Sequence, residues 1–319
     1  MRLLQANYNV LDRTEGQAAN QKIGLRCRQS ELSPLQYEHH SPLSKFIKET
    51  RVSVLSVEKD DRITIVTLNR PQARNALSPE LLGRLAQTWD AIKLDDSIRA
   101  VVLTGAPGST FCAGFDLALS ITILNGTRKP ENEWDEALAN DWTLAHKAML
   151  RDFDLGKPLV VAANGHAIAG GMELLLAGDL RVAASGAKLG LSEVKLGLIP
   201  GMGGTATIRD KMSPALAAEI LLTSNNISAE TAFDGGLLNR VVAADRVLSS
   251  AIELANAVAA NPPLAVRAAR DVLRQSRDLT EAQSLALEAK HLVELAKTED
   301  AIEGPRAFLE KRPAVFTGR

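Results

Sequence analysis

Apolar and polar positions alternate regularly only after residue 51, and the first regular stretch predicts two β-strands. The polar pair Asp60-Asp61 separates two runs rich in β-branched residues, as expected of a hairpin turn. A helix should follow, because Ser78 is a good N-cap residue and Pro79 suits the first helical position. The apolar residues are Val52, Val54, Val57, Ile63, Ile65, Val66 and Leu68 in the strands, and Leu81, Leu82, Leu85, Trp89 and Ile92 on one helix face.

Three short apolar runs further along, residues 100–104, 159–163 and 179–184, have the character of buried strands. Strands that alternate with helical segments predict an α/β architecture. From residue 248 onward nearly the whole chain has helical periodicity, and Thr280 to Gln283 has the form of a capping box. We therefore expect an α/β core over residues 51–247 and a helical C-terminal segment over residues 248–319.

The first 50 residues lack any sustained period and are rich in Gln, Asn, Ser and Arg. A secretory signal would need a continuous apolar core, and a transit peptide would be poor in acidic residues. We expect a weakly ordered extension, or residues upstream of the natural start, that is dispensable. The acidic residues that argue against a transit peptide are Asp12, Glu15, Glu31 and Glu38.

A long connection runs from about residue 116 to residue 157. Asn125-Gly126 is a turn signal, and the apolar residues after it recur at helical spacing. This pattern predicts a helix that packs on the core, and part of that helix is a candidate wall for an apolar ligand pocket. The residues are Trp134, Leu138, Trp142, Ala145, Met149 and Phe153.

Composition and charge exclude several classes of protein. The 319 residues are 45% hydrophobic and 24% charged, as in ordinary globular proteins, and the net charge of -1 would attract neither nucleic acid nor an anionic membrane. The two cysteines, Cys27 and Cys112, form no disulfide framework, so a reducing cytoplasm is expected. No histidine has zinc-ligand spacing, no metal is expected, and no apolar run approaches the ~20 residues that span a bilayer.

Residues 164–176, NGHAIAGGMELLL, are the first segment that could carry chemistry. Gly170 and Gly171 allow a ligand to approach backbone N–H groups at a helix N-terminus, where donors and a positive dipole end suit an oxyanion. Glu173 lies in the first turn of an apolar helix. A carboxylate there often serves only the helix dipole, but a buried one needs a partner or a function.

Two further segments are candidates. In TFCAGFDL, Ala113-Gly114 makes a close turn that exposes the N–H of Phe115, although an ordinary turn with Asp116 as a helix cap explains the pattern equally well. In LGLSEVKLGLIPGMGG, Glu193 stands among apolar neighbours before a glycine-rich loop. Neither this loop nor residues 165–170 match a nucleotide-binding fingerprint. Neither Ser192 nor Cys112 has the sequence context of a catalytic nucleophile.

Taken together, the three segments resemble the enoyl-CoA hydratase (crotonase) superfamily, and the similarity runs from about residue 52 to residue 319. The matching stretches are LNRPQARNALS, VVLTG with FCAGFDL, KPLVVAANGHAIAGGMELLLAGD, LGLSEVKLGLIPGMGG and AFLEKRPAVFTGR. The resemblance implies a crotonase-like spiral of ββα units, C-terminal helices that build trimers or hexamers, and a coenzyme A thioester as substrate, with no separate cofactor.

The resemblance also implies roles for particular residues. The N–H groups of Phe115 and Gly170 would hold the thioester oxygen, and Glu173 and Glu193 would bind one water as the acid/base pair. The implied substrate-binding residues are Ala73, Arg74, Ala76, Ala113, Asp116, Leu117 and Gly171, with Phe308 and Lys311 toward the adenine end, often across a subunit boundary.

The two glutamates favour hydration of a trans-2-enoyl-CoA to a 3-hydroxyacyl-CoA, because relatives with other chemistry often keep only one acid. Gly201 stands where dienoyl-CoA isomerases carry an aspartate, and Met172 replaces a smaller residue, which leaves chain-length preference open. Alternatives are an enoyl-CoA isomerase, a dehydratase for a specialised acyl-CoA, a non-catalytic acyl-CoA binder, and an RNA binder. The last would need a basic helix face, which residues 79–94 lack.

Overall fold

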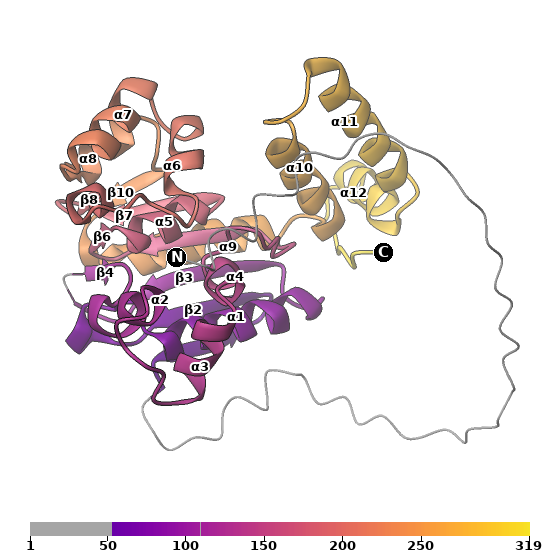
Figure 1. Ribbon diagram of the computed structural model, residues 1–319. Helices are drawn as coiled ribbons and strands as arrows, with labels where there is room; N and C mark the ends of the chain where they lie inside the picture. The colour runs from indigo at the N-terminus through magenta and orange to yellow at the C-terminus, as the bar shows by residue number, and fades with distance from the viewer. Residues whose placement is uncertain (1–52, 109) are drawn as a thin grey trace, which may run out of the picture. The chain divides into compact units, whose positions relative to one another are not determined.

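The computed structural model describes residues 53–108 and 110–319 of the chain (Figure 1). The expected N-terminal extension, residues 1–50, lies outside the described residues. Among the described helices, none is long and apolar enough to cross a membrane.

The strands form two sheets, and from β3 to β8 successive strands alternate between them. The larger sheet, in spatial order, contains β1 (Leu55–Asp60), β2 (Ile63–Leu68), β3 (Ala100–Gly105), β5 (Leu159–Ala163), β7 (Leu180–Ala184) and β10 (Arg240–Val242). The smaller sheet contains β4 (Thr110–Cys112), β6 (His166–Ile168), β8 (Lys188–Gly190) and β9 (Ile227–Ser228). Because β3, β5 and β7 each feed a partner strand in the smaller sheet, the chain is a series of ββα units, as predicted.

Apolar composition explains the centre of the larger sheet. Every residue of β3 and β5 is buried, as expected of parallel strands covered on both faces. These strands pair in parallel with Val102 opposite Val160. The predicted hairpin is confirmed: β1 and β2 are antiparallel, and Asp60 pairs with Ile63 across the turn.

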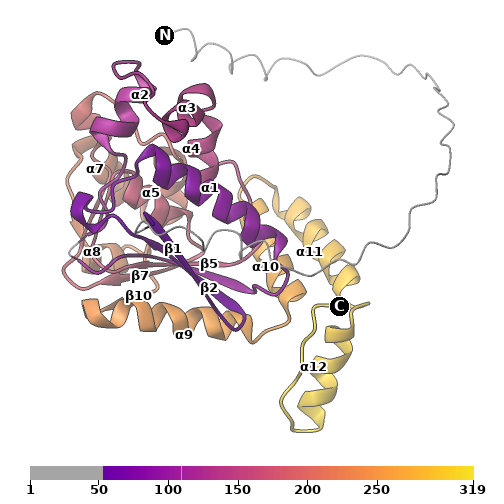
Figure 2. The ribbon, with the colours of Figure 1, turned by 90° about the horizontal axis from the view of Figure 1, so that it is seen from below.

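The helices that precede residue 263 lie beside these strands (Figures 1 and 2). In α1 (Pro79–Leu94) the Ser78 side chain accepts the N–H of Leu81, which confirms the predicted cap. The other helices are α2 (Thr122–Leu124), α3 (Glu133–Asn140), α4 (Thr143–Ala148), α5 (Gly170–Ala177), α6 (Gly204–Thr207), α7 (Pro214–Thr223), α8 (Ala229–Asp234), α9 (Val247–Ala259), α10 (Pro263–Gln275), α11 (Glu281–Leu295) and α12 (Glu299–Leu309).

The single helix predicted for residues 134–153 is wrong, because the chain forms two helices, α3 and α4. Asp141 has an extended backbone conformation, and its side chain accepts the N–H of Thr143 over 2.9 Å, so it ends one helix and starts the next. Side chains such as Asp compete with the helix for backbone N–H groups in this way. The predicted inward-facing residues Leu138 and Met149 are nevertheless buried.

The C-terminal helices join the core through buried contacts. Helix α9 packs on β3, β5 and β7, which places it along the larger sheet (Figure 2). On α10, Arg270 is only 8% exposed and pairs with Asp179 and Asp154, both at 2.8 Å. The predicted capping box of α11 is present, with Thr280 and Gln283 bonded reciprocally.

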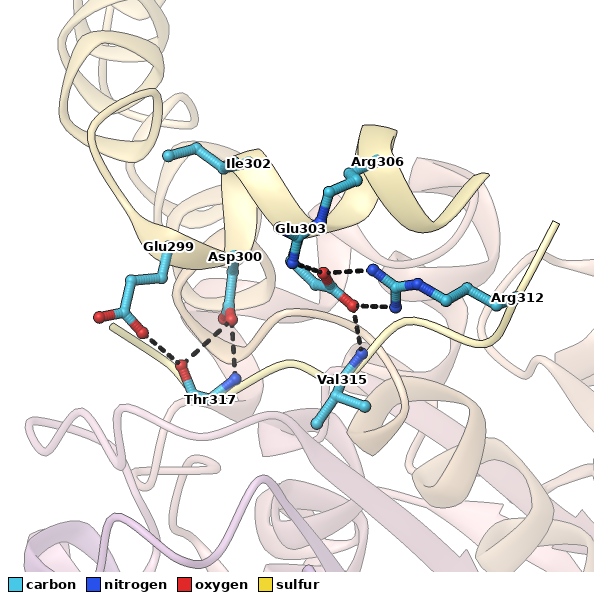
Figure 3. A pocket seen from close by; sticks show the side chains of 8 residues that line it. All are labelled: Glu299, Asp300, Ile302, Glu303, Arg306, Arg312, Val315 and Thr317. Atoms are coloured by element: carbon cyan, nitrogen blue, oxygen red, sulfur yellow. Dashed lines mark hydrogen bonds and ion pairs between the residues drawn. The ribbon is translucent and has the colours of Figure 1, made fainter. Parts of the chain in front are cut away.

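The last residues fold back along α12 and enclose a hollow lined mainly by charged side chains (Figure 3). Glu303 accepts from Arg306 over 2.7 Å and from the Nη2 of Arg312 over 2.8 Å, and the Thr317 N–H donates to Asp300 over 2.7 Å. These bonds fix the returning segment to the helix, so the hollow is stabilised by its own ion pairs.

Candidate active site

Glu173 is the most deeply buried carboxylate of the candidate site. It lies in the first turn of α5, directly after β6, and only 3% of the residue is exposed. Its Oε1 accepts the N–H of Met202 over 2.7 Å and that of Gly204 over 2.9 Å. Burial raises the pKa of the Glu173 carboxyl, while these two N–H donors oppose the rise.

Glu193 is the second carboxylate of the candidate site and lies near enough to Glu173 for the two charges to interact. It begins a short 3₁₀ helix, Glu193–Leu196, shortly after β8. Its Oε2 is buried and has no hydrogen-bond partner among the described residues. Burial, and then the charge of Glu173, raise the pKa of Glu193 to about 7. The two carboxyls are therefore electrostatically coupled, and the second has an oxygen free for a ligand.

The two backbone N–H groups predicted to hold an oxyanion lie beside each other. A Cβ on Gly114 would stand 3.0 Å from the Gly170 nitrogen, so the turn before Phe115 abuts the start of α5. On either side of Phe115, the Gly114 carbonyl accepts the N–H of Leu77, and the Asp116 N–H donates to the Leu77 carbonyl. Within residues 53–108 and 110–319, neither the Phe115 nor the Gly170 N–H donates a hydrogen bond. Both N–H groups are therefore without an acceptor within the described residues.

Close packing and strain mark this turn. Ala169, just before α5, has φ 53 and ψ −125, a conformation that costs ~1–3 kcal/mol in a residue with a side chain. A Cβ on Gly171 would stand 2.1 Å from the Cys112 carbonyl oxygen, so only glycine fits there. The backbone of α5 therefore approaches β4 at the point where the predicted N–H donors lie.

The predicted substrate-binding residues divide into two groups. Ala73, Arg74 and Ala76 lie in a loop that is tied to β4, because the Ala113 N–H donates to the Arg74 carbonyl over 3.1 Å. Leu117 is 55% exposed and follows Asp116, whose N–H donates to the Leu77 carbonyl over 3.0 Å. This first group gathers around the candidate N–H donors.

Asp116 has structural partners in the same region. It pairs with Arg70, with 3.2 Å between Arg70 Nη2 and Asp116 Oδ2, and its side chain accepts the N–H groups of Ala118 and Leu119. The cap predicted for Asp116 is thereby confirmed. The ion pair also connects Asp116, directly after Phe115, to Arg70.

Phe308 and Lys311 form the second group. They lie in and just after α12, and Phe308 is 81% exposed. Within the described residues, no hydrogen bond, ion pair or ring contact joins either side chain to Glu173 or Glu193. Their assignment to a binding site stays a prediction that one chain does not test.

Sequence reasoning missed three groups at the site. The amides of Met202 and Gly204 anchor Glu173, although the loop that holds them was noted only as tight and glycine-rich. Arg151 lies near enough to lower the pKa of Glu173 through its charge. An arginine after a helical stretch carries no local signal of such a position, so nothing in the sequence pattern distinguished it.

Cysteine chemistry and a metal centre have no support in the described residues. Cys112 is buried, and burial raises the pKa of its thiol to about 12, so it is protonated at neutral pH. The described part of the chain contains no group of three or more His, Cys, Asp or Glu side chains placed to hold a metal ion.

Comparisons with known proteins identify the family of this chain. The sequence profile of the enoyl-CoA hydratase/isomerase family matches residues 58–319. An enoyl-CoA hydratase of Mycobacterium tuberculosis is 40% identical over 264 residues, which cover 82% of this chain and 96% of that protein. A 2,3-dehydroadipyl-CoA hydratase of Escherichia coli is 39% identical over 272 residues, covering 84% and 100%.

Solved structures show the same fold. The crystal structure of an enoyl-CoA hydratase from Bacillus anthracis superposes with a TM-score of 0.76 at 34% identity and covers 83% of this chain and 100% of that chain. The chain belongs to the enoyl-CoA hydratase/isomerase family, the crotonases, and has the α/β crotonase fold. Its chemistry is accordingly that of a crotonase hydratase or dehydratase on acyl-CoA thioesters.

Proposed function

We propose that this crotonase adds water across the C2–C3 double bond of a trans-2-enoyl-CoA and releases a 3-hydroxyacyl-CoA. The observation that carries the proposal is the electrostatic interaction of the buried Glu173 with the half-buried Glu193, whose Oε2 has no hydrogen-bond partner among the described residues, together with two backbone N–H groups that have no acceptor there. In hydration the carboxyls would transfer protons and the N–H groups would stabilise negative charge. A purely structural pair of carboxylates would have hydrogen-bond donors for all its buried oxygens.

The thioester oxygen binds between the N–H groups of Phe115 and Gly170 in this proposal. As water attacks C3, the electrons of the double bond move toward C2 and the thioester carbonyl, and negative charge develops on its oxygen. Two fixed donors stabilise that charge, typically by ~3 kcal/mol each. The dipole of α5 adds to the effect because Gly170 is its first residue.

Glu173 and Glu193 divide the proton transfers. Burial raises the pKa of Glu173, and the two N–H groups that donate to it oppose that rise; we assign to Glu173 the removal of a proton from the attacking water. Glu193, with its pKa raised to about 7, holds a proton near neutral pH and delivers it to C2. After hydration Glu173 carries a proton and Glu193 has lost one. Transfer of one proton from Glu173 to Glu193, directly or through solvent, restores the starting state of the pair.

The assembly proposed for this enzyme is a homotrimer or a pair of trimers. The C-terminal helices expose large apolar side chains, which a lone chain would leave in water. Such a surface fits association through α10–α12 and would bring Phe308 and Lys311 to the substrate of a neighbouring subunit. The most exposed are Phe308 at 81%, Leu309 at 79%, Leu273 at 73% and Leu292 at 66%.

Turnover of crotonyl-CoA tests the proposed reaction. A hydratase removes the conjugated enoyl-thioester absorbance and yields 3-hydroxybutyryl-CoA, which chromatography identifies. Conversion of a 3-enoyl-CoA to the 2-enoyl isomer without water addition would instead indicate an isomerase. Tight binding of CoA esters without turnover would indicate a binding protein, and light scattering on the same sample gives the number of subunits.

A further inference from the structure

The backbone around Phe115 pairs with Leu77 through a parallel β-bridge. The Leu77 N–H donates to the Gly114 carbonyl over 2.8 Å, and the Asp116 N–H donates to the Leu77 carbonyl over 3.0 Å. The bridge is one residue pair long, so the segment after Asp116 also bears on the orientation of the Phe115 peptide. The N–H of that peptide is one of the two proposed donors to the thioester oxygen.

The chain after Asp116 forms a π-helical turn, Leu117–Ile121. The Ser120 N–H donates to the Asp116 carbonyl over 2.8 Å. The Ser120 hydroxyl donates to the Leu77 carbonyl over 2.7 Å, which is the same oxygen that accepts the Asp116 N–H. π-Helical turns are rare and often occur at functional sites. The turn and the β-bridge therefore share one acceptor, and a shift of the turn would displace the peptide of Phe115.

Arg128 holds the other side of this turn. Its Nη2 donates to the Leu119 carbonyl over 2.9 Å. Its Nη1 and Nη2 also donate to the two carboxylate oxygens of Asp135, over 2.6 and 2.9 Å, and such a bidentate pair fixes the plane of the guanidinium. Asp135 lies in α3 and is only 2% exposed. The hydrogen bonds from Arg128 lower the pKa of Asp135, so the pair stays charged at neutral pH.

Helix α3 is itself fixed on α1 (Figure 1). A Cβ on Gly83 of α1 would overlap the ring of Trp134, so only glycine lets the two helices approach this closely. Trp134 directly precedes Asp135, and α1 starts two residues after Leu77. The contacts therefore form a closed circuit, which leads from Leu77 through α1, α3 and Arg128 back to the turn.

We propose that Arg128 is a positioning residue for the reaction: held by Asp135, it fixes the turn that orients the Phe115 N–H toward the thioester oxygen. This inference rests on the proposed function, because it takes that N–H as a donor to the thioester. Arg128 acts through the turn and touches no substrate. Its effect should therefore be large where negative charge develops on the thioester oxygen, and small where that oxygen stays neutral.

Acetoacetyl-CoA tests this inference without turnover, because it has no C2–C3 double bond to hydrate. When its C2 loses a proton to solvent, the enolate places negative charge on the thioester oxygen and absorbs in the near ultraviolet. The ratio of bound enolate to bound keto form, called the enolate ratio below, therefore reports how well the N–H donors are aligned. Arg128→Met should lower the enolate ratio by ~10-fold and kcat/KM for crotonyl-CoA by ~10- to 100-fold. The affinity for butyryl-CoA, whose thioester oxygen is neutral, should change by less than about 3-fold.

Glu131→Gln is the matched control, because the Glu131 carboxylate also pairs with Arg128, at 3.5 Å, but is 73% exposed. It should leave the enolate ratio unchanged. Asp135→Asn keeps the size of the side chain but removes the ion pair, so it should lower the enolate ratio by ~3- to 10-fold. Arg128→Lys should recover part of the loss, since lysine can donate to Leu119 or Asp135 but lacks the planar fork. Melting curves check that each variant is folded.

A wild-type enolate ratio in folded Arg128→Met would overturn the inference, and Asp135→Asn decides in the same way if Arg128→Met does not fold. A loss of butyryl-CoA affinity as large as the loss in enolate ratio would also overturn it, because the binding site as a whole would then be damaged. If the wild type does not hydrate crotonyl-CoA but Arg128→Met lowers the enolate ratio, the proposed reaction fails while the positioning role stands. If crotonyl-CoA is hydrated and the enolate ratio is unchanged, only the positioning role fails.

Discussion

The Gly204 amide and the Glu173 carboxylate are in direct contact, with the N–H donating to Oε1 over 2.9 Å. A Cβ on Gly204 would stand 3.0 Å from the same oxygen and 2.8 Å from the Pro200 Cβ. The loop that follows Glu193 therefore sets the position of the other glutamate. A residue without a side chain is required where the loop touches the carboxylate.

Substitution in this loop gives the first prediction. Gly204→Ala should displace Glu173 and lower kcat for hydration by ~10- to 100-fold, since small misplacements of reacting groups have effects of this size. Gly201→Ala is the matched control, because a Cβ there meets only the Ile199 carbonyl oxygen at 3.8 Å. Steady-state kinetics compares the two variants. Equal activity of both would show that the Gly204 contact does not position Glu173.

The second prediction distinguishes two possible roles of Gly170: donation of its N–H, and the space left by its missing side chain. Gly170→Pro removes the donor at the first position of α5, so turnover should fall by ~100- to 1000-fold, and melting curves show whether its Cβ, 3.0 Å from the Phe115 ring, also lowers stability. Gly170→Ala keeps the N–H and adds a Cβ 3.0 Å from the Phe115 ring, so its loss should be much smaller. Similar kinetics for the two variants would mean that the thioester oxygen is held by other donors.

The third prediction concerns stability and pH. The pKa of Glu193 in the folded protein is about 7, above the model-compound value of 4.5. The folded state therefore binds more protons between these values, and stability decreases as pH rises through that window. Glu193→Gln removes this cost, so its melting temperature should exceed that of the wild type at pH 8, with ~2–4 °C for each kcal/mol recovered.

A control with the opposite sign is available at Glu230. Its own backbone N–H and then the Ser185 hydroxyl lower the pKa of Glu230 to about 2, so its ionised form favours the folded state. Glu230→Gln should therefore not raise the melting temperature at pH 8. At pH 4.5 the melting temperatures of Glu193→Gln and the wild type serve as the check on the substitution itself. If they are equal there, and Glu193→Gln still melts at or below the wild type at pH 8, then burial of the ionised Glu193 carboxyl does not cost stability.

Much of the fold could be predicted because its signals are local. The turn at Asp60, the cap at Ser78 and the capping box at Thr280 each depend on residues within one turn of chain. The buried strands β3 and β5 are apolar throughout, so their composition was sufficient. Glu173 could also be singled out from its neighbours in the sequence, because a carboxylate within an apolar helix needs a partner or a function.

The rest depends on contacts between distant parts of the chain. The amides that anchor Glu173 belong to residues 29 and 31 positions away, and backbone donors carry no sequence signature. Arg151 is an ordinary surface residue by its pattern, and only the folded chain brings its charge near Glu173. The break between α3 and α4 was missed because Asp141 caps a helix whose apolar spacing continues across it.

A double-mutant cycle at the two glutamates tests the central claim most directly. Glu173→Gln, Glu193→Gln and the double variant are compared in kcat/KM for crotonyl-CoA, with melting curves and binding of a saturated CoA ester as checks on the fold and the binding site. If the two carboxyls share one water, each single change should lower hydration by ~10²- to 10⁴-fold. The double change should then cost far less than the product of the two, because groups that act as a unit are not additive. Near-normal hydration by either single variant, with the fold intact, would contradict the two-glutamate mechanism.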